Sequence, residues 1–303
     1  MKMRHFMVSG KLIIILSVCI VFLGCKKQDP EIYPDADRTI NISGGITIDN
    51  GVGMKNPIFN YVTYEDFLRH ITSSDHFLIV PQKDFKNTTS TDKVVLSLRH
   101  DMDDNINAAV KIAYRDHKYG ITASFFVLHT ATYYGHEVGT VFKRNDNIIY
   151  YLKAIQDTFG QEVGFHNDLV TLQLIYEIPS REYLKEELGF LRGNGINIVG
   201  TTYHGSPYTY TYHYSNSDFW TEYSTTADEF ITKGFKTIKV EKDSLPSYNF
   251  LYEGGMLGQD YFFSDSYFIN GKRWNMSMVN LDTIKPGKKV IILTHPQHWN
   301  GDY

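Results

Sequence analysis

The chain has 303 residues, of which 42% are hydrophobic and 21% are charged. These values are ordinary for a globular protein of one large domain or two small ones, and they exclude a disordered or collagen-like chain. The formal net charge of -4 gives no basic excess, so we expect no nucleic-acid partner.

The N-terminus carries the features of an export signal. Three cations within the first 11 residues precede an apolar run over residues 12–23, which ends at Gly24-Cys25. The run is shorter than the roughly 20 residues that a transmembrane helix needs, but it suits a secretory signal. Residues 22–25, Phe-Leu-Gly-Cys, resemble a bacterial lipobox, so we predict a signal peptide over residues 1–24 and lipidation of Cys25. An uncleaved N-terminal anchor is the alternative.

The next segment predicts a tether. Residues 25–57 are polar and rich in Gly, Asn and Asp, without helical or strand periodicity, and residues 58–303 are predicted to form the folded domain. Residues 26–31 resemble the charged tails that follow the lipidated Cys in outer-membrane lipoproteins. We therefore expect a lipid-anchored protein of the bacterial cell envelope, held at the outer membrane.

Strands and helices alternate along the predicted domain. Val94 to Leu98 form an apolar run, and apolar residues then recur at helical spacing from Ile106 until Gly120. Alternation of this kind implies parallel strands, in a doubly wound sheet or a barrel. The aromatic stretch over residues 208–214 predicts a loop or an exposed strand. The further expected elements are a strand over 121–128, a helix over 148–159, a strand over 162–165, a helix around 184–191, and strands over 196–201 and 289–293.

Carboxylates and histidines follow the ends of four predicted strands. In a parallel β/α fold these ends lie on one face, where residues distant in sequence converge. Carboxylates and imidazoles together suit a divalent metal such as zinc, and a position left open for water gives hydrolytic chemistry. The alternative task for Asp103 or Asp104 is to cap the helix near Ile106. The residues that follow these strands are Asp101 and Asp103, His166 and Asp168, His204, and His295.

Four segments in order resemble the polysaccharide deacetylase superfamily, the NodB-homology domain of carbohydrate esterase family 4. They are Leu-Ser-Leu-Arg-His-Asp-Met-Asp over 96–103, Tyr-Gly-Ile-Thr-Ala-Ser-Phe-Phe-Val over 119–127, Glu-Val-Gly-Phe-His over 162–166 and Ile-Leu-Thr-His-Pro over 292–296. The resemblance covers about residues 60–303. It implies a distorted (β/α) barrel of about seven parallel strands and metal-dependent removal of acetyl groups from a glycan.

The resemblance also implies a role for each matching residue. Asp101 corresponds to the general base and His295 to the acid that protonates the leaving group. Asp103 and His166 correspond to metal ligands. The family's second metal histidine falls at Val170, which cannot bind metal, so His204 or Asp168 is expected to supply the third ligand.

Other departures leave assignments open. The family's base-orienting arginine motif is absent, and Arg99 or Arg273 could replace it. Asp265 and Trp274 could stand in for the motif that packs against the catalytic histidine. These departures also allow an alternative function, a catalytically inactive carbohydrate-binding lipoprotein. The residues predicted to contact an acetylated carbohydrate substrate are Arg99, Tyr203, Tyr208, Trp274 and Trp299.

Overall fold

The computed structural model describes residues 39–49, 64–138, 141–223, 230–266, 268–269, 272–273 and 280–299. All of them belong to the compact unit Asp37–Tyr303. No helix in these ranges combines the length and the apolar character that crossing a membrane requires.

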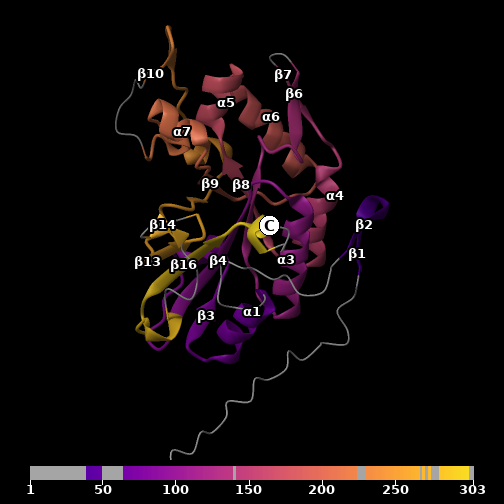
Figure 1. Ribbon diagram of the computed structural model, residues 1–303, viewed down its shortest axis with the longest axis vertical. Helices are drawn as coiled ribbons and strands as arrows, with labels where there is room; N and C mark the ends of the chain where they lie inside the picture. The colour runs from indigo at the N-terminus through magenta and orange to yellow at the C-terminus, as the bar shows by residue number, and fades with distance from the viewer. Residues whose placement is uncertain are drawn as a thin grey trace, which may run out of the picture. The chain divides into compact units, whose positions relative to one another are not determined.

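Parallel strands form a curled sheet that makes up half of a barrel (Figure 1). The strand order is β12-β9-β8-β5-β4-β16-β13, and every neighbouring pair is parallel. A short strand, β3, pairs in parallel with the first part of β4. The predicted distorted (β/α) barrel of about seven parallel strands is therefore confirmed. The strands of this sheet are β3 (Phe77–Ile79), β4 (Val94–Met102), β5 (Ser124–Leu128), β8 (Glu162–Asn167), β9 (Gly200–Tyr203), β12 (Tyr252–Glu253), β13 (Tyr261–Ser264) and β16 (Lys289–Thr294).

Helices pack on the outer face of the sheet and bury most of the apolar core there (Figure 1). Short hairpins and helical turns connect the layers. The helices are α1 (Tyr64–Ser73), α2 (Gln82–Phe85), α3 (Ile106–Lys118), α4 (Ile148–Lys153), the π-helical turn η2 (Ala154–Thr158), α5 (Leu169–Tyr176), α6 (Ser180–Gly193), α7 (Pro207–Tyr212), and the 3-10 turns η1 (Ser43–Gly45), η3 (Asn216–Phe219), η4 (Leu245–Tyr248), η6 (Leu281–Thr283) and η7 (Pro296–Trp299). The hairpins are β1 (Thr39–Ile42) with β2 (Ile46–Asp49), β6 (Gly135–Val138) with β7 (Val141–Arg144), β10 (Phe230–Lys233) with β11 (Lys236–Lys239), and β14 (Phe268–Ile269) with β15 (Lys272–Arg273).

The helix after β4 begins with a cap that decides one open question. Asn105 is the N-cap of α3, and its side chain accepts a hydrogen bond from the backbone N–H of Ala108. Gly120 follows the helix with φ +69°, the left-handed conformation that glycine supplies at helix ends. Capping is therefore done by Asn105, and Asp103 is available for another task.

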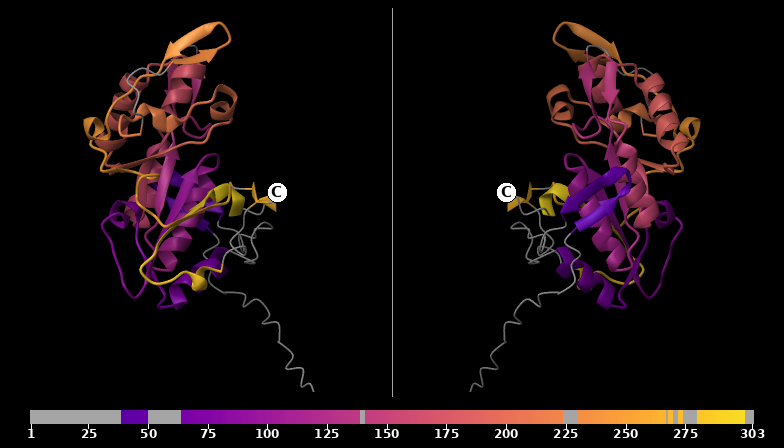
Figure 2. Two further views of the ribbon diagram at one scale, coloured as in Figure 1. Left: turned by 90° about the vertical axis from the view of Figure 1, so that its left-hand side faces the viewer. Right: turned by 90° about the vertical axis from the view of Figure 1, so that its right-hand side faces the viewer.

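The predicted tether is wrong for residues 39–49, which form the hairpin β1–β2. Ile40 and Ile48 are directly opposite each other in this hairpin, so their side chains lie on the same face. Both are buried in the main core. Figure 2 shows the indigo hairpin beside the helices. A Cβ on Gly44 would come within 2.8 Å of the ring of Tyr150 in α4, so the hairpin turn approaches this helix closely. The short Ile-x-Ile repeats on either side of Gly44-Gly45 are the sequence signal for this hairpin.

The aromatic stretch predicted as a loop or strand begins with a helix, α7. Ser206 caps it by accepting a hydrogen bond from the N–H of Tyr208, and Pro207 occupies the first helical turn. Both residues are typical of a helix start, and they outweigh the alternation of Tyr with Thr that favours a strand.

Two glycines make room for aromatic rings inside the curled sheet. A Cβ on Gly164 of β8 would overlap the ring of Phe126, and a Cβ on Gly200 of β9 would overlap the ring of Tyr252. The two rings meet edge to face with centroids 6.5 Å apart. The small residues on β8 and β9 therefore set how closely these rings can fill the interior.

We expect Gly164→Ala to lower the free energy of unfolding by about 1–3 kcal/mol, because the added methyl group overpacks the interior. Gly189→Ala is the matched control. Gly189 lies in α6 with open space around its Cβ position, so alanine there should raise stability by about 0.5–1 kcal/mol. Urea unfolding of both variants measures the difference, and equal effects would contradict the packing argument.

Candidate metal site

The candidate site forms at the carboxyl ends of the central strands. Arg99 and Asp101 lie two residues apart on β4, so their side chains point to the same inner face. Asp103 follows on the same side just beyond the strand. β8 presents His166, which pairs in register with Thr202 of β9, and His204 comes directly after β9. The structure thus brings together residues from β4, β8 and β9, although β5 lies between β4 and β8 in the sheet.

Asp103, His166 and His204 form a group whose potential ligand atoms all lie within 4.8 Å of one another. Nε2 of His166 is 3.3 Å from Oδ1 of Asp103, and Nε2 of His204 is 3.8 Å from Oδ2 of Asp103. The exposed fractions of the Asp103 and His204 side chains are 23% and 15%, whereas His166 is almost fully buried. The group is therefore open to solvent on one side, as a site that admits water and substrate must be.

Hydrogen bonding fixes which atom of His166 faces this group. Nδ1 of His166 lies 3.0 Å from the backbone carbonyl of Thr202, which can only accept, so Nδ1 carries the proton. In the neutral imidazole, Nε2 then presents a lone pair to carboxylate oxygens of Asp103 and Asp101, each 3.3 Å away. Among the described residues, none donates a hydrogen bond to the buried Oδ1 of Asp103. A lone pair facing an unpartnered carboxylate oxygen fits a bound cation.

Asp168 contacts His204 and is poorly placed to be a metal ligand itself. Thr130 donates to Oδ2 of Asp168 at 2.6 Å, and Asn216 donates to Oδ1 at 2.7 Å. Oδ1 also lies 3.3 Å from Nδ1 of His204, on the side of the ring away from Asp103. Both carboxylate oxygens are thus engaged, and the geometry favours His204 over Asp168 as the third ligand. The backbone N–H of Asp168 donates to His129, which sequence reasoning left without a role.

Arg99 holds Asp101 in a buried, two-pronged ion pair. Nε of Arg99 donates to Oδ1 of Asp101 at 2.8 Å, and the terminal nitrogen donates to Oδ2 at 2.6 Å. Both side chains are nearly fully buried. Such a bidentate pair fixes the plane of the carboxylate. The predicted substrate contact at Arg99 is therefore replaced by a contact to Asp101, the alternative that the sequence left open.

His295 reaches the group from β16 on the other side of Asp103. Its Nε2 lies 3.2 Å from Oδ2 of Asp103, and its Nδ1 lies 2.5 Å from Oδ1 of Asp265. His298 contacts the second oxygen of Asp265 at 2.7 Å. Asp265, His295 and His298 form a second group of potential metal ligands. In this second group, however, each oxygen of Asp265 lies at hydrogen-bond distance from an imidazole nitrogen. N–H groups of the two histidines can therefore satisfy the carboxylate without a metal ion.

The charges at the site shift several pKa values in opposite directions. Burial alone would raise the pKa of Asp103, but His295 and His166 hold it well below its usual value. Burial opposes the charging of His204 and His295, yet neighbouring carboxylates raise the pKa of both histidines. Burial lowers the pKa of His129 to about 3, so this histidine is neutral. The site therefore concentrates ionic groups that stabilise one another's charged forms.

The predicted substrate residues divide into three cases. Tyr203 and Tyr208, which lie close to His204 in the sequence, are each 39% exposed, so a ligand can reach them. Trp299 is a correction, because it is fully buried with its ring 4.9 Å from that of Tyr64 in the core. Trp274 lies outside the described residues. The same holds for Cys25.

Two further residues named by the sequence are accounted for. Val170 is buried in α5 and faces the core, so it takes no part in the site. Arg273 lies in β15, but its side chain is outside the described part of the chain. Sequence reasoning missed Thr130 and Asn216, which no pattern in the sequence marks. For His298 it left open a place in the wall of the site and a core or surface role.

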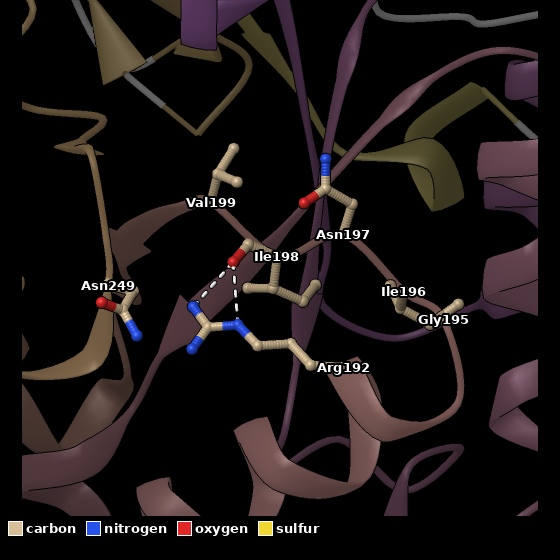
Figure 3. A pocket seen from close by; sticks show the side chains of 7 residues that line it. All are labelled: Arg192, Gly195, Ile196, Asn197, Ile198, Val199 and Asn249. Carbon is tan, nitrogen blue, oxygen red and sulfur yellow. Dashed lines mark hydrogen bonds between the residues drawn. The ribbon is translucent and has the colours of Figure 1, made fainter.

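A surface pocket of about 410 Å³ lies away from this site (Figure 3). It is lined by the loop before β9, at the opposite end of that strand from His204. The guanidinium of Arg192 in this pocket donates to the backbone carbonyls of Ile198 and Tyr248. These hydrogen bonds attach the C-terminal part of α6 to the loop before β9. Arg192 therefore has a structural role in this pocket.

Comparison with known proteins gives no match: no protein-family model, no curated protein and no solved structure matches this chain.

The geometry predicts a graded loss of metal affinity. Asp103→Ala and His166→Ala should each abolish stable binding of a divalent ion such as zinc, because each removes one of the three potential ligand groups. His204→Ala should weaken binding more than Asp168→Asn, for which we expect a loss of about 10- to 100-fold, typical of a residue that orients a ligand. Isothermal titration of the metal-free variants with zinc checks this order. A larger loss for Asp168→Asn than for His204→Ala would reverse the assignment.

Proposed function

We propose that this protein is a zinc-dependent hydrolase that removes acetyl groups from an extracytoplasmic glycan. The observation that carries the proposal is the convergence of Asp103, His166 and His204, with Asp101 on one side and His295 on the other. A metal-dependent hydrolase needs these three parts, namely a set of ligands, a base and an acid. The motifs that resemble polysaccharide deacetylases name the same residues in the same order.

Asp103, His166 and His204 would hold the ion. A bound zinc ion polarises a carbonyl group and lowers the pKa of water, which favours attack on an acetyl group near neutral pH. Oδ2 of Asp101 lies 3.3 Å from Nε2 of His166, so it is close enough to take the proton of the attacking water. Arg99 keeps that carboxylate in place.

His295 is suited to the second proton transfer. Its Nδ1 is engaged with Asp265, so Nε2, which lies 3.2 Å from Oδ2 of Asp103, is the atom that would face the reacting group. Nε2 would give its proton to the departing nitrogen or oxygen of the sugar as the bond to the acetyl carbon breaks. Asp101 lies on β4, and His295 directly follows β16, the strand that pairs with β4. Their separation lets one accept a proton while the other donates one.

The exposed aromatic residues support a sugar as the substrate. Tyr203 and Tyr208 flank His204 in sequence and are both partly exposed. Aromatic side chains offer flat apolar faces and a hydroxyl group, which suit a ring with polar edges. Two contacts support an active enzyme over the inactive carbohydrate-binding alternative. His204 lies near Asp103, where it could replace the family's second metal histidine, and Arg99 pairs with Asp101, where it could replace the base-orienting arginine.

The test pairs elemental analysis with acetate release. Protein purified without chelator should contain zinc and should release acetate from an acetylated glycan panel, such as N-acetylglucosamine oligomers and O-acetylated xylan. Asp101→Asn should keep its zinc but lose about 10²- to 10⁴-fold in kcat, the usual range for a missing general base.

Three outcomes separate the functions. A wild-type protein with zinc and no acetate release, but with measurable binding to a glycan, would favour the binding protein. Near-normal turnover by Asp101→Asn would remove the proposed mechanism. Absence of any divalent ion would remove the metal-dependent function altogether.

We also propose that a lipid on Cys25 anchors the protein to the outer membrane. Cys25→Ala should give an unlipidated product that no longer sediments with membranes, because a secreted chain without the lipid has no comparable anchor. Membrane fractionation and labelling with a radioactive fatty acid measure this. Cys19→Ala, within the predicted signal, is the control and should leave both results unchanged. Unaltered membrane association of Cys25→Ala would instead support the uncleaved anchor.

A further inference from the structure

The carboxylate of Asp265 is shared by two histidines. It is fully buried at the end of β13, and its Oδ1 lies 2.5 Å from Nδ1 of His295. Oδ2 accepts a hydrogen bond from the backbone N–H of His295 at 2.7 Å and lies 2.7 Å from Nδ1 of His298. Because Asp265 is an acceptor at both oxygens, each imidazole places an N–H on it.

The second histidine stands on a fixed support. His298 belongs to η7, whose first turn is closed by a hydrogen bond from its backbone N–H to the carbonyl of His295 at 2.9 Å. The next residue, Trp299, is fully buried with its ring against Tyr64 of α1. The contacts of η7 with α3 and β4 add to this support. The position of His298 is therefore fixed by buried contacts of η7 and not by contacts at the surface.

We propose that His298 is a positioning residue that acts through Asp265 to aim His295 at the reacting group. This inference rests on the proposed function and adds a residue to its machinery. Without His298, Oδ2 of Asp265 keeps the backbone N–H of His295 but loses its side-chain donor, so the carboxylate can turn about its terminal torsion. Oδ1 then no longer fixes the orientation of the His295 ring through Nδ1. As a result, Nε2 points toward the reacting group for a smaller share of the time.

The proton path leaves His298 unchanged. In the proposed step, Nε2 of His295 gives its proton to the leaving atom, while the proton on Nδ1 stays at Asp265. His298 neither gives nor receives a proton. Its removal should therefore matter only where the leaving group needs protonation, namely an amine or a sugar alcohol. An aryl acetate, whose phenolate leaves unprotonated, should be unaffected.

The experiment compares His298→Ala, His298→Gln and a control, His76→Gln, in the full-length mature protein loaded with zinc. His76 is a partly buried histidine that contacts the backbone carbonyl of Ile284. It directly precedes β3, at the amino ends of the strands, whereas the site lies at their carboxyl ends. We expect His298→Ala to lower kcat on acetylated sugar oligomers by about 10- to 100-fold, as for other residues that orient a functional histidine. KM, zinc content and turnover of 4-nitrophenyl acetate should remain at wild-type values. Glutamine, whose amide can donate to Oδ2, should restore part of the loss.

A second readout is independent of turnover. The Nδ1–H proton of His295, in a short hydrogen bond to a carboxylate, should give a far-downfield proton NMR signal. That signal should shift or broaden in His298→Ala, stay near its wild-type position in His298→Gln, and be unchanged in His76→Gln. An unchanged signal in His298→Ala would overturn the inference, and so would an equal loss of activity on sugar and aryl acetates. If the wild type releases no acetate from any substrate, the proposed function fails, and the NMR comparison alone still decides whether His298 positions His295.

Discussion

The register of β4 is the constraint on which the site depends. Successive residues of a strand point to opposite faces, so a slip of one residue would move Arg99 and Asp101 from the inner face to the outer face. On the outer face, a buried polar cluster fixes this register. It consists of His100, Thr294, Tyr64 and Asp116. Nδ1 of His100 lies 2.8 Å from the hydroxyl of Thr294 on β16, and these two residues are register partners. The cluster therefore locks together the strands that carry Asp101 and His295.

This outer cluster also links the site to the helices. The hydroxyl of Tyr64 in α1 donates to Asp116 of α3 at 2.8 Å, and Nε2 of His100 lies 3.2 Å from the same carboxylate. Tyr64 in addition packs against Trp299, next to His298. A fully buried polar cluster is costly unless its members satisfy one another, so this arrangement favours one relative placement of α1, α3, β4 and β16. Rigidity behind the strands gives the inner side chains their fixed positions.

The sequence predicted the sheet and the strand-end residues because both depend on short-range patterns. Apolar runs that end in Asp or His identify strand ends, and parallel pairing then brings His166 and His204 to one place whatever the details of the loops. The residues that hydrogen-bond to the side chains of the site could not be predicted in this way. Asn216, which donates to Asp168, and Thr130 come from segments without periodicity, and their contacts depend on how η3 and the loop after β5 fold back. The prediction for Trp299 was wrong because a tryptophan four residues after His295 fits a ligand contact and a core position equally well.

Charge compensation distinguishes the two His/Asp groups. Asp101 is paired with the permanent cation of Arg99, and Asp265 accepts N–H groups at both oxygens. Asp103 has no arginine partner, and only its Oδ2 faces an imidazole that the surrounding carboxylates help to charge, that of His295. It meets only imidazole nitrogens, and its buried Oδ1 lacks a donor among the described residues. A buried carboxylate oxygen without a donor is unfavourable, so Oδ1 of Asp103 is the oxygen among these three carboxylates that a bound positive ion would best satisfy. Its neighbours His166 and His204 face it with nitrogen atoms, and an ion shared by all three would satisfy the carboxylate and both lone pairs at once.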